Sequence, residues 1–189
     1  MAAQSSFKNM ALCLTAICLV CSALLAFVNS LTEEPIAAAQ QKKTLESLSA
    51  VLPPFDQVRD EAVSLEGQDY RCYIATRADS LSGCAVISPV IGFGGTLEVM
   101  VGFNADGLVW NTSVLSHSET PGLGAKCEEA SFKDQFKQFD PAVKTLMVRK
   151  DGGDVDAITA STITSRAYTL AVANACKVFQ NLKGGKANE

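Results

Sequence analysis

The chain has 189 residues, which is enough for one domain of ordinary size with an attached segment and too few for two well-cored domains. Charged residues make up 19% of the chain, and its formal net charge is −4 at pH 7. This composition offers no basic surface for nucleic acid and no acidic tail typical of disorder. We therefore expect one soluble domain that does not bind nucleic acid.

An apolar stretch near the N-terminus is the first element of the chain. No charged residue occurs between Met10 and Val28, and a helix of that length spans roughly 28 Å, close to the hydrocarbon thickness of a bilayer. Lys8 precedes the stretch and two glutamates follow it, so the charge bias predicts a cytoplasmic N-terminus. We therefore expect residues 1–9 in the cytoplasm, a single transmembrane helix over 10–28, and the rest of the chain outside.

Two other interpretations of this stretch stay open. A cleaved secretory signal also begins basic and apolar, although its apolar region has about 7–15 residues and no clear A-x-A-like site precedes the polar residues here. A buried helix of the soluble domain is the third alternative, but a helix apolar on every face needs a larger core than this chain can form. Both the anchor and the signal export residues 31–189.

The seven cysteines fall into two groups. Within the apolar stretch, Cys18 and Cys21 have the spacing of a redox or metal pair, but small buried thiols are common in an apolar helix. The cysteines beyond the stretch do not have the spacing of a zinc or iron–sulfur site, so we predict no metal. A disulfide between Cys72 and Cys84 stays open, because sequence alone does not settle the pairing.

The rest of the chain is expected to form a stalk over residues 29–54 and an α+β domain over residues 55–189. In the stalk, leucines recur at helical spacing from Pro35 to Val51, and a Pro-Pro pair follows. In the domain, runs rich in β-branched and aromatic residues alternate with turn residues and predict an antiparallel sheet. These runs are 69–77, 83–91, 96–104 and 108–116.

Helices are expected to pack on this sheet. A short helix is predicted over 131–139, a further strand over 143–149, and a final apolar helix over 163–182. Strands followed by a covering helix are typical of an α+β fold.

Hydroxyl side chains crowd the start of the final helix, within residues 154–166. A helix N-terminus presents unpaired N–H groups and a partial positive charge, and hydroxyls add further donors, so this segment suits a phosphate group. The same residue types also cap helices without binding any ligand. The segment alone therefore leaves a phosphate site and a simple cap open. The hydroxyls belong to Thr159, Ser161, Thr162, Thr164 and Ser165.

A second segment, residues 117–126, has the sequence His-Ser-Glu-Thr-Pro-Gly-Leu-Gly-Ala-Lys. Pro121 fixes one φ angle, while Gly122 and Gly124 allow backbone conformations closed to other residues. These properties suit a loop that lies against a flat ring, and they also suit an ordinary turn between a hairpin and a helix.

Together the two segments resemble the motifs of FMN-binding domains. Residues 156–165 are similar to the flavinylation motif, whose usual core is Ser/Thr-Gly-Ala-Thr preceded by Asp, and residues 119–124 are similar to the Glu-Thr-Pro-Gly-Leu-Gly loop. In that family the last threonine of the core carries the FMN phosphate as an ester, which implies Thr162 here. Ala160 stands in place of the usual glycine and Ser161 in place of the usual alanine.

The resemblance covers most of the chain. Residues 51–53 and 92–102 are also similar to the G subunits of Rnf electron-transport complexes. The corresponding C subunit of sodium-translocating NADH:quinone reductase shares both motifs but is generally longer. That protein, a free-standing flavinylated extracytosolic carrier and an anchored domain without redox activity are the alternatives.

The resemblance implies a flavoprotein subunit of the bacterial inner membrane that carries electrons in an ion-translocating ferredoxin:NAD oxidoreductase and does not catalyse alone. Its soluble domain is expected on the outer, periplasmic face. Its partners are expected to be the other subunits of the Rnf complex, and a flavin transferase is expected to attach the FMN covalently.

Both motifs are implied to form the cofactor site, without catalytic or metal-binding residues. We expect His117, Lys126 and Arg166 to be solvated and Trp110 to pack in or beside the core. The candidate cofactor-binding residues are Thr159, Ser161, Thr162, Ile163 and Thr164 in one segment and Glu119, Thr120, Gly122, Leu123 and Gly124 in the other.

Overall fold

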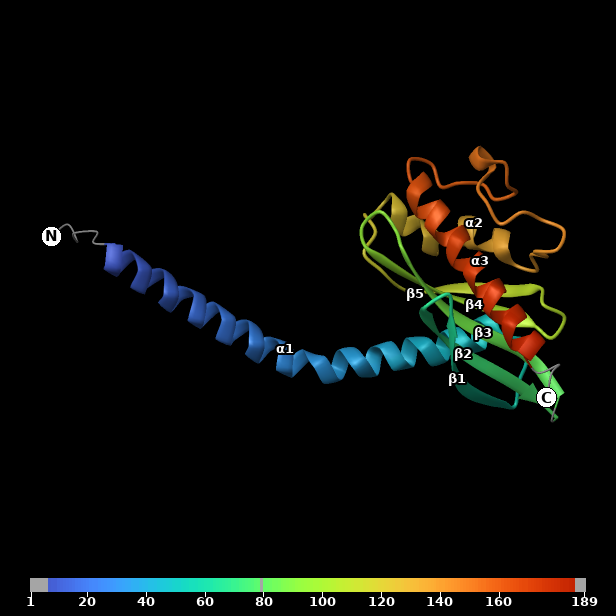
Figure 1. Cartoon of the computed structure of the whole chain (residues 1–189), viewed down its shortest axis with the longest axis horizontal. Helices are drawn as coiled ribbons and strands as arrows, with labels where there is room; N and C mark the ends of the chain where they lie inside the picture. Colours follow the sequence, from blue (N-terminus) through green and yellow to red (C-terminus); the bar gives the residue numbers. More distant parts are fainter. Residues whose placement is uncertain (1–6, 79, 186–189) are drawn as a thin grey trace. The chain divides into compact units, whose positions relative to one another are not determined.

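The computed structural model of the protein describes residues 7–78 and 80–185. The chain divides into two compact units, Met1–Lys42 and Lys43–Glu189. Figure 1 shows the elements in chain order: α1 (Phe7–Val51), β1 (Gln57–Leu65), β2 (Gln68–Arg77), β3 (Ser80–Ile91), β4 (Thr96–Asn104), β5 (Val109–His117), the 3-10 helix η1 (Gly124–Glu128), α2 (Ala130–Lys133), the 3-10 helices η2 (Asp134–Phe136) and η3 (Arg149–Asp151), and α3 (Thr162–Gly185).

Helix α1 contains the apolar stretch and the predicted stalk helix as one continuous element. Its N-terminal part is long and apolar enough to cross a membrane, by length and composition, and its apolar side chains are exposed. We expected a separate helix to start at Pro35, but Pro35 lies inside α1. A proline removes one backbone hydrogen bond, and here the helix continues through that loss.

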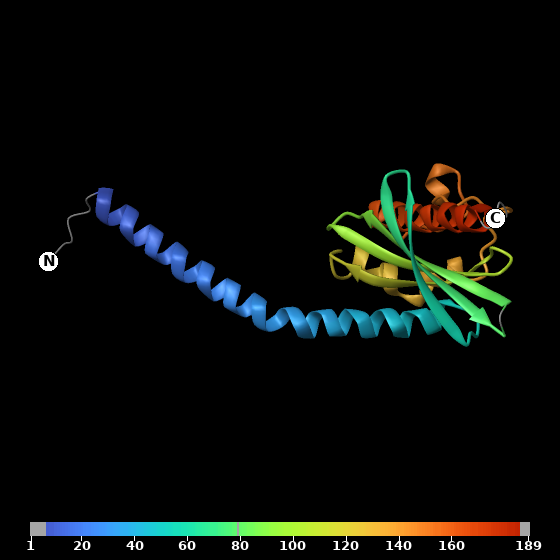
Figure 2. The same cartoon turned by 60° about the horizontal axis from the view of Figure 1, so that its bottom comes forward.

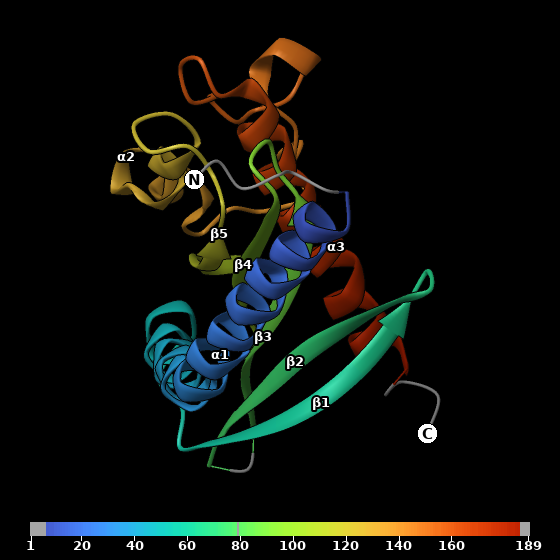
Figure 3. The same ribbon diagram turned by 90° about the vertical axis from the view of Figure 1, so that its left-hand side faces the viewer.

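The five strands form one antiparallel sheet in the order β1-β2-β3-β4-β5, so each strand pairs with its neighbour in sequence. This arrangement with its packed helices confirms the predicted α+β class. Figure 3 shows β1 at the edge of the sheet. Strand β1 was not predicted, because its sequence lacks the alternation of apolar and polar residues that a half-buried strand carries, and its first four residues are exposed.

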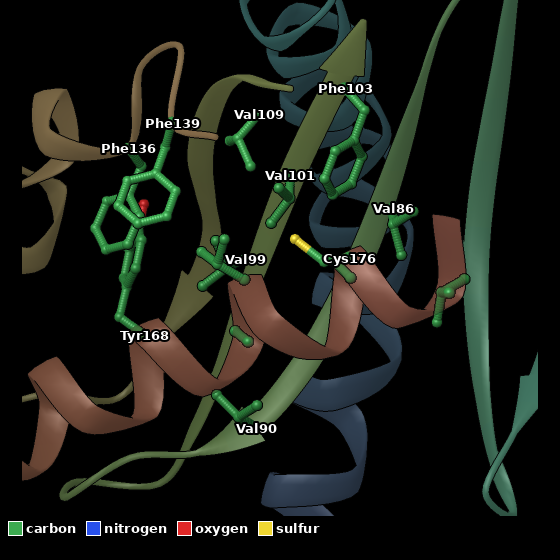
Figure 4. Packing of buried hydrophobic residues seen from close by; sticks show 14 of the residues in the cluster. Val86, Val90, Val99, Val101, Phe103, Val109, Phe136, Phe139, Tyr168 and Cys176 are labelled. Carbon is green, nitrogen blue, oxygen red and sulfur yellow. The ribbon is translucent and has the colours of Figure 1, made fainter. Parts of the chain in front are cut away.

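One face of the sheet packs against α3 and holds the main hydrophobic core. Figure 4 shows Cys176 pointing from α3 toward Val99 and Val101 of β4. Tyr168 is fully buried in an aromatic group, with its ring centroid 4.9 Å from that of Phe136 and 5.2 Å from that of Phe132. This aromatic packing fixes the first half of α3 against α2 and η2, next to the helix N-terminus.

The last turns of α1 pack on the opposite face of the sheet (Figure 2). Leu48 and Val51 are buried there against Met100. A Cβ atom at Gly102 would lie 1.8 Å from the carbonyl oxygen of Val51, so only glycine allows this close approach. The end of the predicted stalk is therefore part of the folded domain.

Between α2 and α3 the chain is mostly irregular. The predicted helix over 131–139 is limited to the short elements α2 and η2, and the predicted strand over 143–149 does not form. Val143 is 79% exposed, and Val148 makes one isolated parallel bridge to Val155. The apolar residues of this segment lack a neighbouring strand with which to pair, so local turns form instead.

All seven cysteines lie in the described residues and are free. Cys72 and Cys84, whose pairing the sequence left open, do not form a disulfide, and the strand register does not place them opposite each other. Cys72 lies opposite Val86 and Cys84 lies opposite Ile74, and both thiols are buried in the core.

Candidate functional site

The two candidate segments meet at one cleft of about 350 Å³. One wall comes from the loop after β5 and the other from residues 160–164 at the start of α3, and Phe93 of the turn between β3 and β4 closes a third side. A cleft of this size is at the lower end of the range for small-molecule sites, about 300–1,000 Å³. The fold therefore brings together two segments separated by α2 and the irregular segment.

Glu119 connects the parts of this cleft. It is 6% exposed, and its Oε1 accepts hydrogen bonds from the backbone N–H groups of Phe93 at 2.7 Å and Gly94 at 3.4 Å. Its Oε2 accepts a hydrogen bond from Oγ1 of Thr164 at 2.9 Å. One carboxyl group thus joins the β3–β4 turn, the loop after β5 and the first turn of α3.

Two glycines leave room for this carboxyl group. A Cβ atom at Gly92 would lie 2.0 Å from Oε1 of Glu119, and one at Gly124 would lie 2.3 Å from Oε2. Any side chain at either position would displace the carboxyl group. Gly124 is therefore required by its close contact with Glu119.

The hydroxyl groups at the start of α3 differ in burial and in hydrogen bonding. Ser165 is fully buried, and its Oγ donates to the carbonyl oxygen of Ser161 and accepts from the N–H of Ile158, both at 2.9 Å. Thr164 is also buried and donates to Glu119. Thr162 is the first residue of α3, is half-buried and lines the cleft. Within residues 7–78 and 80–185, its hydroxyl has no hydrogen-bond partner.

The residue before these hydroxyls adopts an unusual backbone conformation. Ala160 has φ +62°, in the left-handed region that favours glycine. This is the position where the usual flavinylation motif has glycine. The departure from that motif therefore has a physical cost, and the turn still forms with alanine.

Apolar side chains at the cleft are largely exposed. Phe93 is 69% exposed, Ile163 is 52% exposed and Leu123 is 44% exposed, and all three line the cleft. Exposed apolar groups at a concave site are typical of a ligand-binding surface. Phe93 was not among the predicted site residues. A large aromatic residue inside the glycine-rich run 92–95 was the available signal, because such a turn has no core position for it.

Most of the candidate residues lie at this cleft. Thr159 and Gly122 do not line it, although both are exposed next to residues that do. The candidates that line the cleft are Glu119, Thr120, Leu123, Gly124, Ser161, Thr162, Ile163 and Thr164.

The cations, the histidine and the tryptophan considered with the motifs lie outside the cleft lining. Arg166 forms a double hydrogen bond with Asp151, with both distances 2.7 Å, and this bond lowers the pKa of Asp151. His117 accepts the backbone N–H of Glu119 at its Nδ1. Trp110 is 37% exposed on β5, and Lys126 is exposed. Among the described residues, no lysine or arginine lines the cleft.

Cys127 lies in η1 beside the cleft and is fully buried. Burial raises the pKa of its thiol to about 11, and the negative charges of Glu128 and Glu119 add to this effect. The thiol therefore stays neutral near pH 7 and is poorly suited to nucleophilic or redox chemistry.

The residues present fit an anionic flavin nucleotide. The N-terminus of α3 offers backbone N–H groups without intrahelical partners to a phosphate, and Thr162 places a free hydroxyl at that point. The exposed apolar side chains offer a surface to a flat ring. Groups suited to a phosphate and groups suited to a flat ring therefore lie within one cleft.

Comparison with known proteins gives two family matches. Residues 92–177 match the FMN-binding domain, and residues 1–51 match the RnfG N-terminal region. The first match contains Phe93, Glu119 and Thr162, and the second contains the whole of α1.

Several curated relatives cover most of the chain. The G subunit of the ion-translocating oxidoreductase complex from Cereibacter sphaeroides is 34% identical over 85% of this chain and 78% of its own. Its counterpart from Shewanella baltica is 35% identical, with coverage of 86% and 84%. The G subunit of the proton-translocating ferredoxin:NAD(+) oxidoreductase complex from Clostridium ljungdahlii is 33% identical, with coverage of 92% and 91%.

Among solved structures, the C subunit of the Na(+)-translocating NADH-quinone reductase from Parabacteroides distasonis is similar with a TM-score of 0.49 and 18% identity, over 71% of this chain and 79% of that one. The sequence relatives confirm the family that the motifs predicted. The chain belongs to the family of G subunits of ion-translocating oxidoreductase complexes.

Proposed function

We propose that this protein carries electrons in a ferredoxin:NAD oxidoreductase complex of the Rnf type, with FMN attached covalently to Thr162 through a phosphoester. The observation that carries the proposal is the free hydroxyl of Thr162 at the first residue of α3, inside the cleft. The named function of the Clostridium relative supports the choice of complex.

The contacts of the neighbouring hydroxyls support Thr162 as the acceptor. Thr164 and Ser165 are buried, and their hydroxyls already take part in hydrogen bonds within the protein. Thr159 lies outside the cleft lining. Ser161 lines the cleft but is only 8% exposed, so its hydroxyl is less accessible than that of the half-buried Thr162.

The chain's own residues then hold and shield the cofactor. Backbone N–H groups at the start of α3 are expected to bind the phosphate oxygens, because the helix N-terminus carries a partial positive charge. Phe93, Leu123 and Ile163 are expected to cover the apolar ring and exclude water from it. When bound, FMN supplies reversible electron transfer, and the protein sets its potential through position, hydrogen bonds and nearby charge.

A separate flavin transferase is expected to form the ester, because an unassisted threonine hydroxyl is a poor nucleophile. The Thr162 oxygen attacks the phosphorus on the FMN side of FAD. The bond from that phosphorus to the bridging oxygen breaks, AMP leaves, and the hydroxyl proton passes to a base of the transferase. The ester prevents loss of the cofactor from an exported domain.

The charge bias around α1 supports the proposed location of the domain. Lys8 precedes the apolar part of α1 and two glutamates follow it, which favours a cytoplasmic N-terminus and a soluble domain on the outer face of the bacterial inner membrane. The other subunits of the complex are the expected partners. Reaction of single cysteines with an impermeant thiol reagent on intact cells tests this orientation.

Expression with and without a flavin transferase, followed by flavin fluorescence on a denaturing gel, tests the acceptor. A fluorescent band is expected only with the transferase, and it is expected to vanish in Thr162→Val and persist in Ser161→Ala and Thr159→Val. A band that stays bright in Thr162→Val contradicts the acceptor assignment. A wild-type chain without fluorescence in the presence of the transferase contradicts covalent attachment and favours an anchored binding domain.

A further inference from the structure

We propose that Glu119 is a positioning residue that holds the walls of the cleft together and that its negative charge lowers the reduction potential of the flavin bound there. This inference rests on the proposed function. It assigns Glu119 an indirect role, because its carboxyl oxygens are directed at protein donors.

The hydrogen bonds of Glu119 give its positioning role a structural basis. Both oxygens are occupied: Oε1 by the N–H groups of Phe93 and Gly94, and Oε2 by the hydroxyl of Thr164. These donors come from the β3–β4 turn and from α3, whereas Glu119 belongs to the loop after β5. Phe93 and Thr164 both line the cleft, so moving the carboxyl group would move two of its walls.

The same contacts indicate that Glu119 carries a charge. A carboxylate accepts hydrogen bonds only, whereas a protonated carboxyl group must also donate one. The N–H groups of Phe93 and Gly94 can only donate, so both need an acceptor oxygen, and the Thr164 hydroxyl lies 2.9 Å from Oε2, close enough to donate to it. The ionised form can accept all three bonds. Hydrogen bonds to a charged acceptor are stronger than neutral ones, which favours this form further.

Among the described residues, Glu119 forms no ion pair, and no basic side chain lines the cleft. The N-terminus of α3, where Thr164 binds Oε2, carries a partial positive charge that the phosphate of FMN is also expected to use. Electron uptake adds negative charge to the cleft, and a buried carboxylate in its wall opposes that uptake. The result is a lower reduction potential.

The positioning role is tested first on the chain expressed without the transferase. Glu119→Ala leaves the Phe93 N–H without its acceptor, whereas Glu119→Gln keeps an acceptor oxygen of the same reach. The melting temperature is expected to fall clearly in Glu119→Ala and much less in Glu119→Gln. The exposed Glu128, outside the cleft lining, provides the control Glu128→Gln, which is expected to melt like the wild type. Equal melting of Glu119→Ala and wild type overturns the positioning role.

The charge effect is tested on flavinylated protein. The midpoint potential of Glu119→Gln is expected to be more positive by about 30 mV, which for a two-electron couple corresponds to a tenfold change in the redox equilibrium constant. Glu128→Gln is expected to leave it unchanged. An unchanged potential in flavinylated Glu119→Gln overturns the charge effect while leaving the proposed function intact, whereas a wild-type chain that takes up no flavin contradicts the proposed function itself.

If Glu119→Gln does not fold or is not flavinylated, Thr164→Val decides the charge effect. This change keeps Glu119 in place but removes the donor to Oε2, so the midpoint potential is measured at alkaline pH, where the carboxylate is ionised. There the less screened carboxylate is expected to make the midpoint potential more negative than in the wild type at the same pH. An unchanged or more positive potential in Thr164→Val overturns the charge effect.

Discussion

Four of the five hydroxyls at the start of α3 fall into two groups that look alike in sequence and differ in structure. Thr164 and Ser165 are buried and hydrogen-bonded to other parts of the protein. Thr159 and Thr162 are more exposed, and within the described part of the chain their hydroxyls have no hydrogen-bond partner. The first group stabilises the turn into the helix, and the second is available for chemistry.

This difference arises from the direction of the helix. Residues that lie one turn inside α3 point back over the preceding loop, where Ser165 meets Ile158 and Thr164 meets Glu119. Thr162 is the first helical residue and faces the cleft. A cap and a phosphate site, which were alternatives at the level of sequence, therefore coexist in one segment.

Removing a hydrogen-bonded hydroxyl is expected to have the largest effect on stability. Ser165→Ala leaves the buried N–H of Ile158 without an acceptor, so the free energy of unfolding is expected to fall by about 2 kcal/mol. Denaturant unfolding of the chain without flavin measures this loss. The control Thr169→Val removes a buried hydroxyl that donates to the helical carbonyl of Arg166 and is expected to cost less than about 1 kcal/mol. A Ser165→Ala chain as stable as this control would contradict the division into two groups.

A smaller effect of opposite sign is expected one residue before the hydroxyl pair Ser161–Thr162. Ala160 occupies the left-handed region, which destabilises the folded state by about 1–2 kcal/mol for an alanine. A glycine there would avoid this strain but would lower the free energy of unfolding by about 0.4–1 kcal/mol, because it makes the unfolded chain more flexible. Ala160→Gly is therefore expected to stabilise the protein by roughly 0.5–1 kcal/mol, as measured by denaturant unfolding. Gly152, also at positive φ, gives the converse change Gly152→Ala, which is expected to destabilise. Destabilisation by Ala160→Gly would show that the turn does not hold this residue in the left-handed region.

The smallest effect is expected at the exposed hydroxyl outside the cleft. Thr159→Val is predicted to change the free energy of unfolding by less than about 0.5 kcal/mol and to leave flavin attachment unchanged. Thr162→Val is predicted to be equally small in stability but to abolish the fluorescent band. Loss of the band in both variants would mean that Thr159 contributes to attachment, contrary to its position.

Much of the fold was predictable because most strands can be recognised from their own residue composition and from the turn residues beside them. Strand β4 has the predicted bounds, since it contains the β-branched or aromatic residues Thr96, Val99, Val101 and Phe103 and turn residues flank it. The final helix was predicted from its apolar spacing and hydroxyl-rich start, and α3 begins one residue earlier than expected. These signals are local, so sequence alone carries them.

The features that sequence analysis missed depend on contacts with residues far away in the chain. Strand β1 is polar and exists because β2 supplies hydrogen bonds along one edge. Residues 143–149 have the composition of a strand but lack a neighbouring strand in the fold. At the site, the motifs indicated which residues belong together, whereas the contact of Glu119 with Phe93 required the folded arrangement of two loops.

Mass spectrometry of the protein from its native membrane shows whether Thr162 carries the phosphate of FMN. Tryptic cleavage after Lys150 and Arg166 releases residues 151–166, which contain all five hydroxyls at the start of α3. We expect a peptide with one FMN phosphoryl group and fragment ions that place the group on Thr162. An unmodified peptide, or fragment ions that place the group on Thr159, Ser161, Thr164 or Ser165, would contradict this assignment.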